Sequence, residues 1–166
     1  PRCARRQAES NPSARLALRD WADACPMSEA ATAIVWFRRD LRLADNPALS
    51  AAIEHAQRVI PLYVHAPEEE GDWPPGAASR WWLHRSLGSL AASLKTRGAT
   101  LHVRRGPTSS AIMSVARATG ATRVCWNRLY EPAIAARDAR LAAELREAGL
   151  EVECFNAALF VEPWST

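Results

Sequence analysis

The feature that most constrains the fold is a regular alternation of short and long segments that begins near Ala33. Short runs rich in β-branched and aromatic residues alternate with longer runs whose apolar residues recur at helical spacing. The expected strands are residues 34–37, 59–65, 100–104, 123–126 and 151–155. The expected helices are residues 47–57, 77–97, 108–118 and 132–148.

The connections predict how these strands pair. Each is helical and long enough to cross over a sheet, so neighbouring strands should run parallel with right-handed crossovers. We therefore predict an α/β fold, a Rossmann-like doubly wound five-stranded parallel sheet in the order 3-2-1-4-5 with helices on both faces. In such sheets ligands bind beyond the carboxyl ends of the strands, where the winding reverses. The loops after the first and fourth strands are therefore the expected site.

The second expected helix carries a clear apolar stripe. Four leucines recur at helical spacing and are expected to face the sheet: Leu83, Leu87, Leu90 and Leu94. Near the start of this helix, Trp81 and Trp82 are adjacent and must point in different directions. We interpret the pair as core packing plus an interface contact.

The beginning of the chain differs from the rest. Residues 1–32 are interpreted as a disordered leader with Met27 as the natural start, because the segment is polar and rich in alanine and arginine. An organelle transit peptide is one alternative, and a short helix over residues 13–24 is another. Residues 33–160 form the expected domain.

Composition excludes several classes of protein. A hydrophobic share of 48% is enough for a single buried core. The apolar runs are strand-sized and interrupted by charge, so no membrane span is expected, and we expect a soluble protein of the reducing cytoplasm. The net charge of +3 and the pI of about 9.0 permit contact with a phosphate backbone without predicting it.

Common motifs of metal and catalytic sites are missing from the sequence. The four cysteines contain no C-x-x-C pair, and the four histidines show no H-E-x-x-H or other metal spacing. The glycine-rich dinucleotide fingerprint, the P-loop and the G-x-S-x-G elbow are absent as well. Cys125 and Cys154 fall inside expected strands and are interpreted as small buried hydrophobic residues. The motifs therefore indicate neither a metal site nor a catalytic nucleophile.

Two polar loops follow the strands at which the winding should reverse. After the first strand comes RRDLR at residues 38–42, which either orders itself through ion pairs or forms a rigid rim for a flat anionic or heteroaromatic ligand. After the fourth strand, Asn127 and Glu131 either serve the local structure, Glu131 by complementing a helix dipole, or point into the crevice and bind a ligand's ring edge. The residue types alone do not decide between the structural and the ligand-binding role of either loop.

Taken together, several motifs closely resemble the DNA photolyase and cryptochrome family. They are VWFRRDLRLADNPAL at residues 35–49, ASR at 78–80, RGP at 105–107, WNRLYEP at 126–132, and Arg137-Asp138. The resemblance extends over residues 34–164. The first block is the most specific, because a strand, an Arg-Arg-Asp-Leu-Arg turn and Asp-Asn-Pro rarely occur together at this spacing.

The resemblance implies an N-terminal antenna-chromophore domain that is followed, in the family, by a helical domain holding FAD and the UV-damaged DNA. Light-driven electron transfer from reduced FAD splits cyclobutane pyrimidine dimers there, so we expect no catalytic residue in this chain. Residues 161–166 are expected to begin the connector to that domain, and the chain alone is expected to be inactive. We also expect an exposed apolar face where the helical domain docks, and a monomeric full-length protein.

The resemblance also suggests site residues. Arg39, Tyr63, Arg80 and Glu131 match positions that line the deazaflavin pocket in members that use this antenna, and Asn127 completes the candidate set. Two positions depart from the known patterns. Leu129 replaces an acidic residue of deazaflavin-binding members, and residues 133–134 replace the Asn-Glu of folate-binding ones. The antenna, methenyltetrahydrofolate or deazaflavin, is therefore unassigned.

Three functions follow from these observations. The first is the antenna domain of a DNA photolyase that repairs cyclobutane dimers. The second is the same domain of a cryptochrome, a blue-light photoreceptor, since the residues that separate the two classes lie in the helical domain. The third, based on the fold alone, is a nucleotide-binding module of the electron-transfer-flavoprotein or stress-protein type, although such modules usually carry a glycine-rich phosphate loop.

Overall fold

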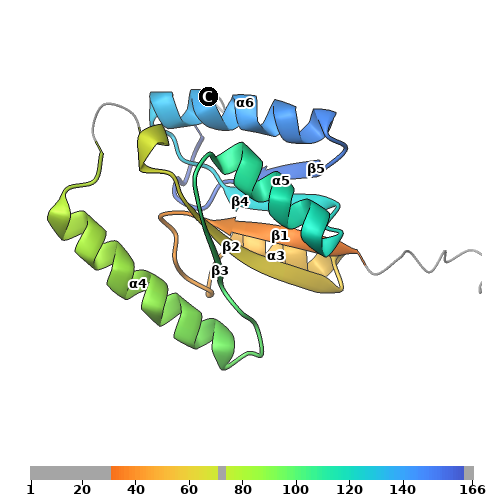
Figure 1. Cartoon of the computed structure of the whole chain (residues 1–166), viewed down its shortest axis with the longest axis horizontal. Coiled ribbons are helices and arrows are strands. Elements are labelled where there is room, and N and C mark those ends of the chain that lie inside the picture. Colours follow the sequence, from red (N-terminus) through yellow and green to blue (C-terminus); the bar gives the residue numbers. More distant parts are fainter. Residues whose placement is uncertain (1–30, 71–73, 163–166) are drawn as a thin grey trace, which may run out of the picture. The chain divides into compact units, whose positions relative to one another are not determined.

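The computed structural model describes residues 31–70 and 74–162. The expectations for a leader, for Met27 and for a helix over residues 13–24 lie outside the described residues. Within them, one parallel sheet forms the centre of the domain and helices pack on both sides of it (Figure 1).

The sheet has the expected order, β3-β2-β1-β4-β5, and every neighbouring pair is parallel. The strands are β1 (Thr32–Phe37), β2 (Arg58–His65), β3 (His102–Arg105), β4 (Arg123–Asn127) and β5 (Glu151–Phe155). The winding reverses between β1 and β4, which pair through Ala33–Arg123, Ile34–Val124 and Val35–Cys125. The prediction of a doubly wound fold is confirmed.

Five helical elements connect the strands: α3 (Pro47–His55), the 3₁₀ turn η1 (Pro67–Glu69), α4 (Ala77–Lys95), α5 (Thr108–Thr119) and α6 (Pro132–Glu147). One core cluster joins the inner faces of α5 and α6 to the sheet around Ile34, Leu62 and Val124. A second cluster joins α3 and the end of α4 to the opposite face around Val35 and Phe37. Both faces of the sheet are therefore covered, as expected.

Local sequence explains where α3 begins and ends. Asn46 caps the helix by accepting a hydrogen bond from the backbone N–H of Leu49 at 3.1 Å, and Pro47 occupies the first helical position. The preceding Asp45 adopts a left-handed φ of 50°, which aspartate tolerates better than most residues. The helix ends at His55, two residues earlier than expected, because Ala56 is already extended at the approach to β2.

The expectation for the leucine stripe of α4 is only half right. Leu90 and Leu94 are buried against the sheet, whereas Leu83 and Leu87 are only half-buried. Figure 1 shows α4 standing apart from the sheet over much of its length. Trp81 is 60% exposed, so core packing is not its role. The first half of α4 forms the wall of a cavity instead of covering the sheet.

The two strand cysteines behave as expected. Cys125 is completely buried and Cys154 is half-buried. Burial raises the pKa of Cys125 to about 12, so its thiol remains protonated and unreactive at neutral pH. In the described ranges no cluster of histidine, cysteine and carboxylate side chains could hold a metal ion, and no described helix is long and apolar enough to cross a membrane.

Asn127, at the end of β4, ties the site loop to the sheet. Its amide nitrogen donates hydrogen bonds to the Asp40 carboxylate and, at 2.9 Å, to the Asn46 side-chain oxygen. Its own oxygen accepts a hydrogen bond from the backbone N–H of Ala48 at 3.1 Å. Asn127 is 4% exposed, so these bonds satisfy a polar group that water cannot reach. One side chain thereby fixes the loop after β1 and the start of α3.

We expect Asn127→Ala to lower the free energy of unfolding by about 2 to 3 kcal/mol, because it leaves buried partners unsatisfied. Urea denaturation monitored by circular dichroism measures the change. The matched control is Asn156→Ala, which removes side-chain bonds from an exposed turn and should cost less than about 1 kcal/mol. Equal losses in the two variants would contradict the role assigned to Asn127.

Candidate functional site

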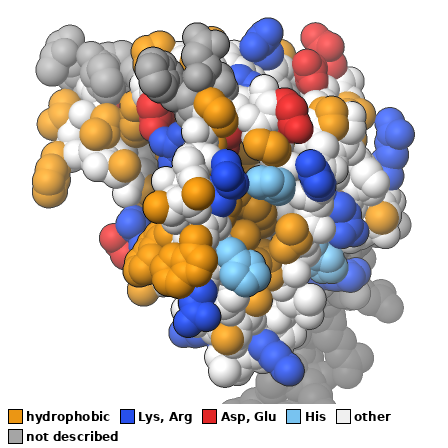
Figure 2. Space-filling view, turned by 60° about the vertical axis from the view of Figure 1, so that its left-hand side comes forward, with side chains coloured by type: hydrophobic (Ala, Val, Ile, Leu, Met, Phe, Trp, Pro, Cys, Tyr) orange, Lys and Arg blue, Asp and Glu red, His pale blue; other side chains and the backbone are white. Residues whose placement is uncertain are grey.

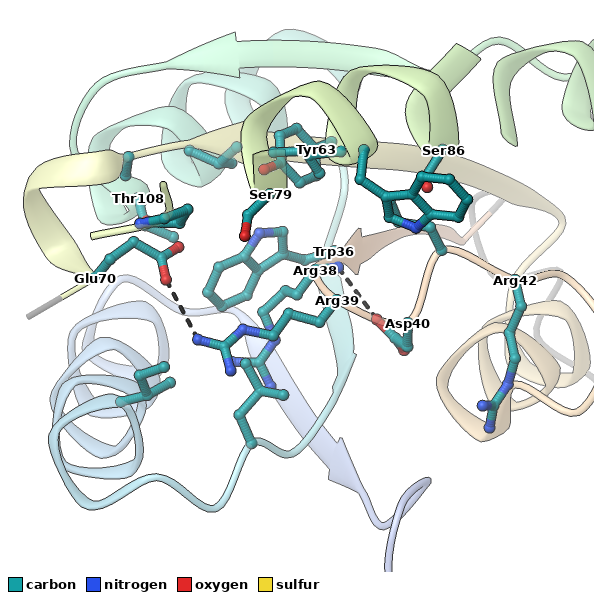
Figure 3. Close-up of a pocket in the computed structure, with 18 of the residues that line it drawn as sticks. Trp36, Arg38, Arg39, Asp40, Arg42, Tyr63, Glu70, Ser79, Ser86 and Thr108 are labelled. Atoms are coloured by element: carbon teal, nitrogen blue, oxygen red, sulfur yellow. Dashed lines mark hydrogen bonds and ion pairs between the residues drawn. The ribbon is translucent and has the colours of Figure 1, made fainter. Parts of the chain in front are cut away.

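A cavity of about 1250 Å³ opens at the carboxyl ends of β1 and β2. The loop after β1, the end of β2 and the first half of α4 form most of its wall (Figure 3). Its lining includes Trp36, Arg38, Arg39, Tyr63, Ser86 and Arg137, together with both indoles of α4, Trp81 and Trp82. The site thus lies at the expected carboxyl edge of the sheet, but of the two loops expected to form it the one after β4 contributes only Leu129 to the lining.

Trp36 forms an aromatic surface inside this cavity. Its ring packs edge-to-face against Trp126, with 5.5 Å between the ring centroids. Two guanidinium groups lie near the same ring, that of Arg38 at 4.8 Å and that of Arg137 at 5.6 Å from its centroid. Its indole Nε1 is buried and has no hydrogen-bond partner among the residues that the structure describes. A buried donor without a partner in a cavity wall suits a ligand with an acceptor.

Below Trp36, a buried ion pair joins β1 to α6. Arg38 donates hydrogen bonds to the Asp138 carboxylate and to the backbone oxygen of Asn127, and only 7% of Arg38 is exposed. Burial lowers the pKa of Arg38 from its ordinary value, and the charge of Asp138 opposes this effect. Arg137 donates to the other oxygen of Asp138 at 2.8 Å. The carboxylate therefore holds two arginines against the aromatic surface.

The network continues to the start of α5. The Glu69 carboxylate accepts a hydrogen bond from the backbone N–H of Thr108 at 2.8 Å and from its hydroxyl at 2.5 Å. It also lies 3.9 Å from the guanidinium of Arg137. The helix lacks a side-chain cap of its own, so Glu69 supplies one from another element. The cap fixes the loop after β2 beside the cavity.

Arg39 spans the mouth of the cavity. It donates to Glu131 at the start of α6 and, at 3.4 Å, to Glu70 after η1. Both ion pairs are solvent-exposed, so they contribute little stability and can open at low cost. Figure 3 shows the guanidinium of Arg39 directed at Glu70, while Arg42 points away from this group. Arg39 is thus the rim residue that a ligand would meet first.

The five candidate residues occupy different positions. Arg39 and Tyr63 line the cavity, and Glu131 reaches its rim through Arg39. Burial raises the pKa of Tyr63, so its hydroxyl remains a donor at neutral pH. Arg80 is exposed outside the lining and donates to the backbone oxygen of Pro75 at 2.8 Å. Asn127 uses its amide within the protein, in the structural role that was one of its two alternatives.

Sequence reasoning missed three participants: Trp36, Glu69 and Arg137. Trp36 stood inside an expected strand and was counted only as part of it. Alternation along a strand could have separated it from Val35 and Phe37, which face the other core cluster. Arg137 was noticed only as part of a family motif, without a role in the site. Glu69 gave no local signal, because its role depends on contacts between distant segments.

These contacts define a class of protein. A doubly wound α/β domain with an aromatic-walled cavity at the carboxyl ends of its strands has a shape suited to a flat heteroaromatic group. The model of the DNA photolyase family matches residues 33–166. The chain therefore belongs to the DNA photolyase family, as its N-terminal α/β domain.

Curated relatives include both photoreceptors and repair enzymes. The chain is 48% identical over 132 residues to Cryptochrome-2 of Arabidopsis thaliana. The aligned region covers 79% of this chain and 21% of the relative. It is 44% identical over 133 residues to the deoxyribodipyrimidine photo-lyase of Agrobacterium fabrum. That alignment covers 80% of this chain and 27% of the relative. The chain thus spans only a fifth to a quarter of the length of these relatives.

Solved structures agree with the fold. A bacterial class III photolyase from Agrobacterium tumefaciens superposes with a TM-score of 0.75 at 40% identity, over 84% of this chain and 29% of that one. An archaeal photolyase from Sulfolobus tokodaii superposes with a TM-score of 0.66 at 28% identity, over 75% of this chain and 29% of that one. That structure was solved with two FAD molecules and is described as implying a novel light-harvesting cofactor.

We expect Asp138→Asn to lower the free energy of unfolding by about 3 kcal/mol, because Arg38 remains buried without its counter-charge. The double variant Arg38→Met, Asp138→Asn should be less destabilised than the single one, because no uncompensated guanidinium is left buried. Urea unfolding of the two variants and the wild type measures both changes. If the double variant loses more stability than Asp138→Asn, Arg38 is not the residue that requires the carboxylate.

Proposed function

We propose that this chain is the antenna-chromophore domain of a deoxyribodipyrimidine photo-lyase. The observation that carries the proposal is the cavity at the carboxyl ends of β1 and β2, with the Trp36 indole in its wall and an unpartnered Nε1 beside it. A chromophore in this cavity would be shielded from water on one side and open to solvent at the rim. Arg39, Tyr63, Arg80, Asn127 and Glu131 are the proposed binding residues, with Asn127 acting through the loop that it fixes.

The residues of the cavity fit a flat ring system. The Trp36 ring is only 4% exposed, so its contribution is the Nε1 donor, and Tyr63 offers a hydroxyl. Methenyltetrahydrofolate and deazaflavin are the proposed antennas, and a flavin is a further one because the archaeal relative holds two FAD molecules. When bound, an antenna would supply light absorption and excitation transfer to FAD. The chain's part is to bind the ring, orient it and exclude water from one face.

In the protein extended to the length of its relatives, we propose that a helical domain holds FAD and UV-damaged DNA. The proposed reaction is the light-driven splitting of cyclobutane pyrimidine dimers, carried out by a monomer in the cytoplasm. None of the cavity residues would touch the DNA lesion, so this domain supplies light and no catalytic residue.

A cryptochrome photoreceptor is the second candidate. The observation in its favour is the identity of 48% to Cryptochrome-2 of Arabidopsis thaliana, slightly above the 44% to the Agrobacterium photo-lyase. Electron-transfer and stress-protein modules fit less well, because the β1 loop lacks the glycine-rich phosphate turn that they usually carry.

We expect the purified chain to bind at least one of methenyltetrahydrofolate, 8-hydroxy-deazaflavin and riboflavin in this cavity. Ser86→Trp places an indole in the cavity from α4 and should weaken that binding about tenfold or more. Titration of ligand fluorescence measures both dissociation constants.

The matched control is Ser89→Trp, the same substitution one turn further along α4, where the serine is exposed and outside the cavity lining. It should bind like the wild type. If none of the three ligands binds, or if both variants bind equally well, the antenna site is not here.

The repair activity needs the complete gene product. We expect that protein, purified with reduced FAD, to restore dimer-containing oligonucleotides under near-ultraviolet or blue light and to leave them unrepaired in the dark. Chromatography of the oligonucleotides measures the repair. Light-dependent changes in FAD redox state without any repair would favour the cryptochrome over the photolyase.

A further inference from the structure

One long segment of this chain contains no acidic residue. Residues 77–130, from the start of α4 to the loop after β4, include nine arginine and lysine residues and no aspartate or glutamate. The rest of the chain therefore carries twelve cations and all 18 acids. The small net charge of +3 is the difference between an acidic part and a strongly basic part.

Six of these cations lie on α4, on the turn after it and on β3. They are Arg80, Arg85, Lys95, Arg97, Arg104 and Arg105. All six are exposed, and in the described parts of the chain none contacts a carboxylate. The arginines around the cavity, in contrast, have acidic neighbours. Each lies within 4 Å of a carboxylate oxygen: Arg38, Arg39, Arg42 and Arg137. We call the six residues the basic face.

Two indoles lie among these cations. Trp81 is 60% exposed and Trp82 is 67% exposed, and their ring centroids are 6.1 Å apart. The guanidinium of Arg85 lies 5.9 Å from the centroid of Trp81. Figure 2 shows this side of the molecule, with a large hydrophobic patch that has Lys or Arg and His side chains beside it. Exposed aromatic faces next to unpaired cations are unusual on a surface that faces only water.

The basic face extends over two consecutive elements. Arg80 and Lys95 are fifteen residues apart on α4, a separation of about 22 Å along the helix axis. Arg105 continues the series on β3, the strand at one edge of the sheet, whereas the adjacent Arg104 projects from the other side of that strand. An elongated row of positive charge fits a partner with regularly spaced negative charge.

We propose that the basic face binds single-stranded nucleic acid. Phosphates would contact the cations on the α4 side, and unstacked bases would stack on Trp81 and Trp82, the combination by which proteins bind single strands without sequence preference. The site adjoins the antenna cavity, because both indoles also line that cavity and Arg80 belongs to the proposed antenna residues, and it is distinct from the dimer site of the proposed helical domain. It would give the light-collecting domain its own contact with DNA beside the lesion.

The observations favour a nucleic acid over an acidic membrane. Membrane binding by a helix requires a broad apolar face to enter the acyl region. The buried leucines of α4, Leu90 and Leu94, already pack on the sheet, which leaves the two indoles as its large exposed apolar side chains. The cations also continue onto β3, where no helix could insert.

The test is fluorescence anisotropy of a labelled oligothymidylate, titrated with the purified chain at several salt concentrations. The wild type should bind in the micromolar range and more tightly than it binds a duplex of equal length. Arg85→Gln, Arg97→Gln, Arg105→Gln should weaken binding about tenfold. It should also reduce the slope of log affinity against log salt by about 2. Trp81→Leu should weaken single-strand binding more than duplex binding.

The control triple variant is Arg58→Gln, Arg117→Gln, Arg140→Gln, which removes the same charge from exposed arginines outside the basic face. It should retain most of the affinity. Equal losses in the two triple variants would reduce the effect to net charge and overturn the proposal. Tighter binding to phosphatidylserine vesicles than to oligothymidylate would overturn it in favour of a membrane. Failure of the oligothymidylate to bind at low salt would overturn it outright.

Discussion

The buried ion pair between Arg38 and Asp138 is the interaction on which the site depends. A guanidinium that is 7% exposed can stay charged only beside a carboxylate, and Asp138 supplies it from α6, a hundred residues away. The pair therefore fixes the position of α6 relative to the end of β1. Because Asp138 also binds Arg137, the same carboxylate places two guanidinium groups against the Trp36 ring. The aromatic wall of the cavity results from this arrangement.

The cavity also requires that one helix leave the sheet. If all four leucines of α4 packed on the sheet, the space beside Trp36 would be filled by side chains. Leu90 and Leu94 anchor the end of the helix, while Leu83 stands in the cavity wall. The incomplete packing reduces the apolar area that this helix buries. A binding site thus replaces part of the hydrophobic core, and the ligand proposed for it would restore some of the lost contacts.

The sequence was sufficient to predict the fold because its main signals are local. Alternating periods predicted the strands and helices, and helical crossovers predicted their parallel order. The edge of the sheet that holds the site followed from the topology, and Arg39 and Tyr63 line the cavity there. The inner design of the site could not be predicted in the same way. The Glu69 cap on Thr108 and the bonds of Asn127 join segments far apart in sequence, so no local pattern reveals them.

Net charge was a poor guide for the same reason. The value of +3 hides an uneven distribution, because all 18 acids lie outside residues 77–130 while that segment holds nine of the cations. Around the cavity each arginine has a carboxylate nearby, so these charges orient loops and attract distant anions only weakly. On α4 and β3 the cations have no such neighbours in the described structure, and their fields add. Arginine therefore has two roles in this domain. The arginines around the cavity are neutralised by carboxylates and order the loops, whereas those on α4 and β3 are not neutralised in the described structure and create a positive surface.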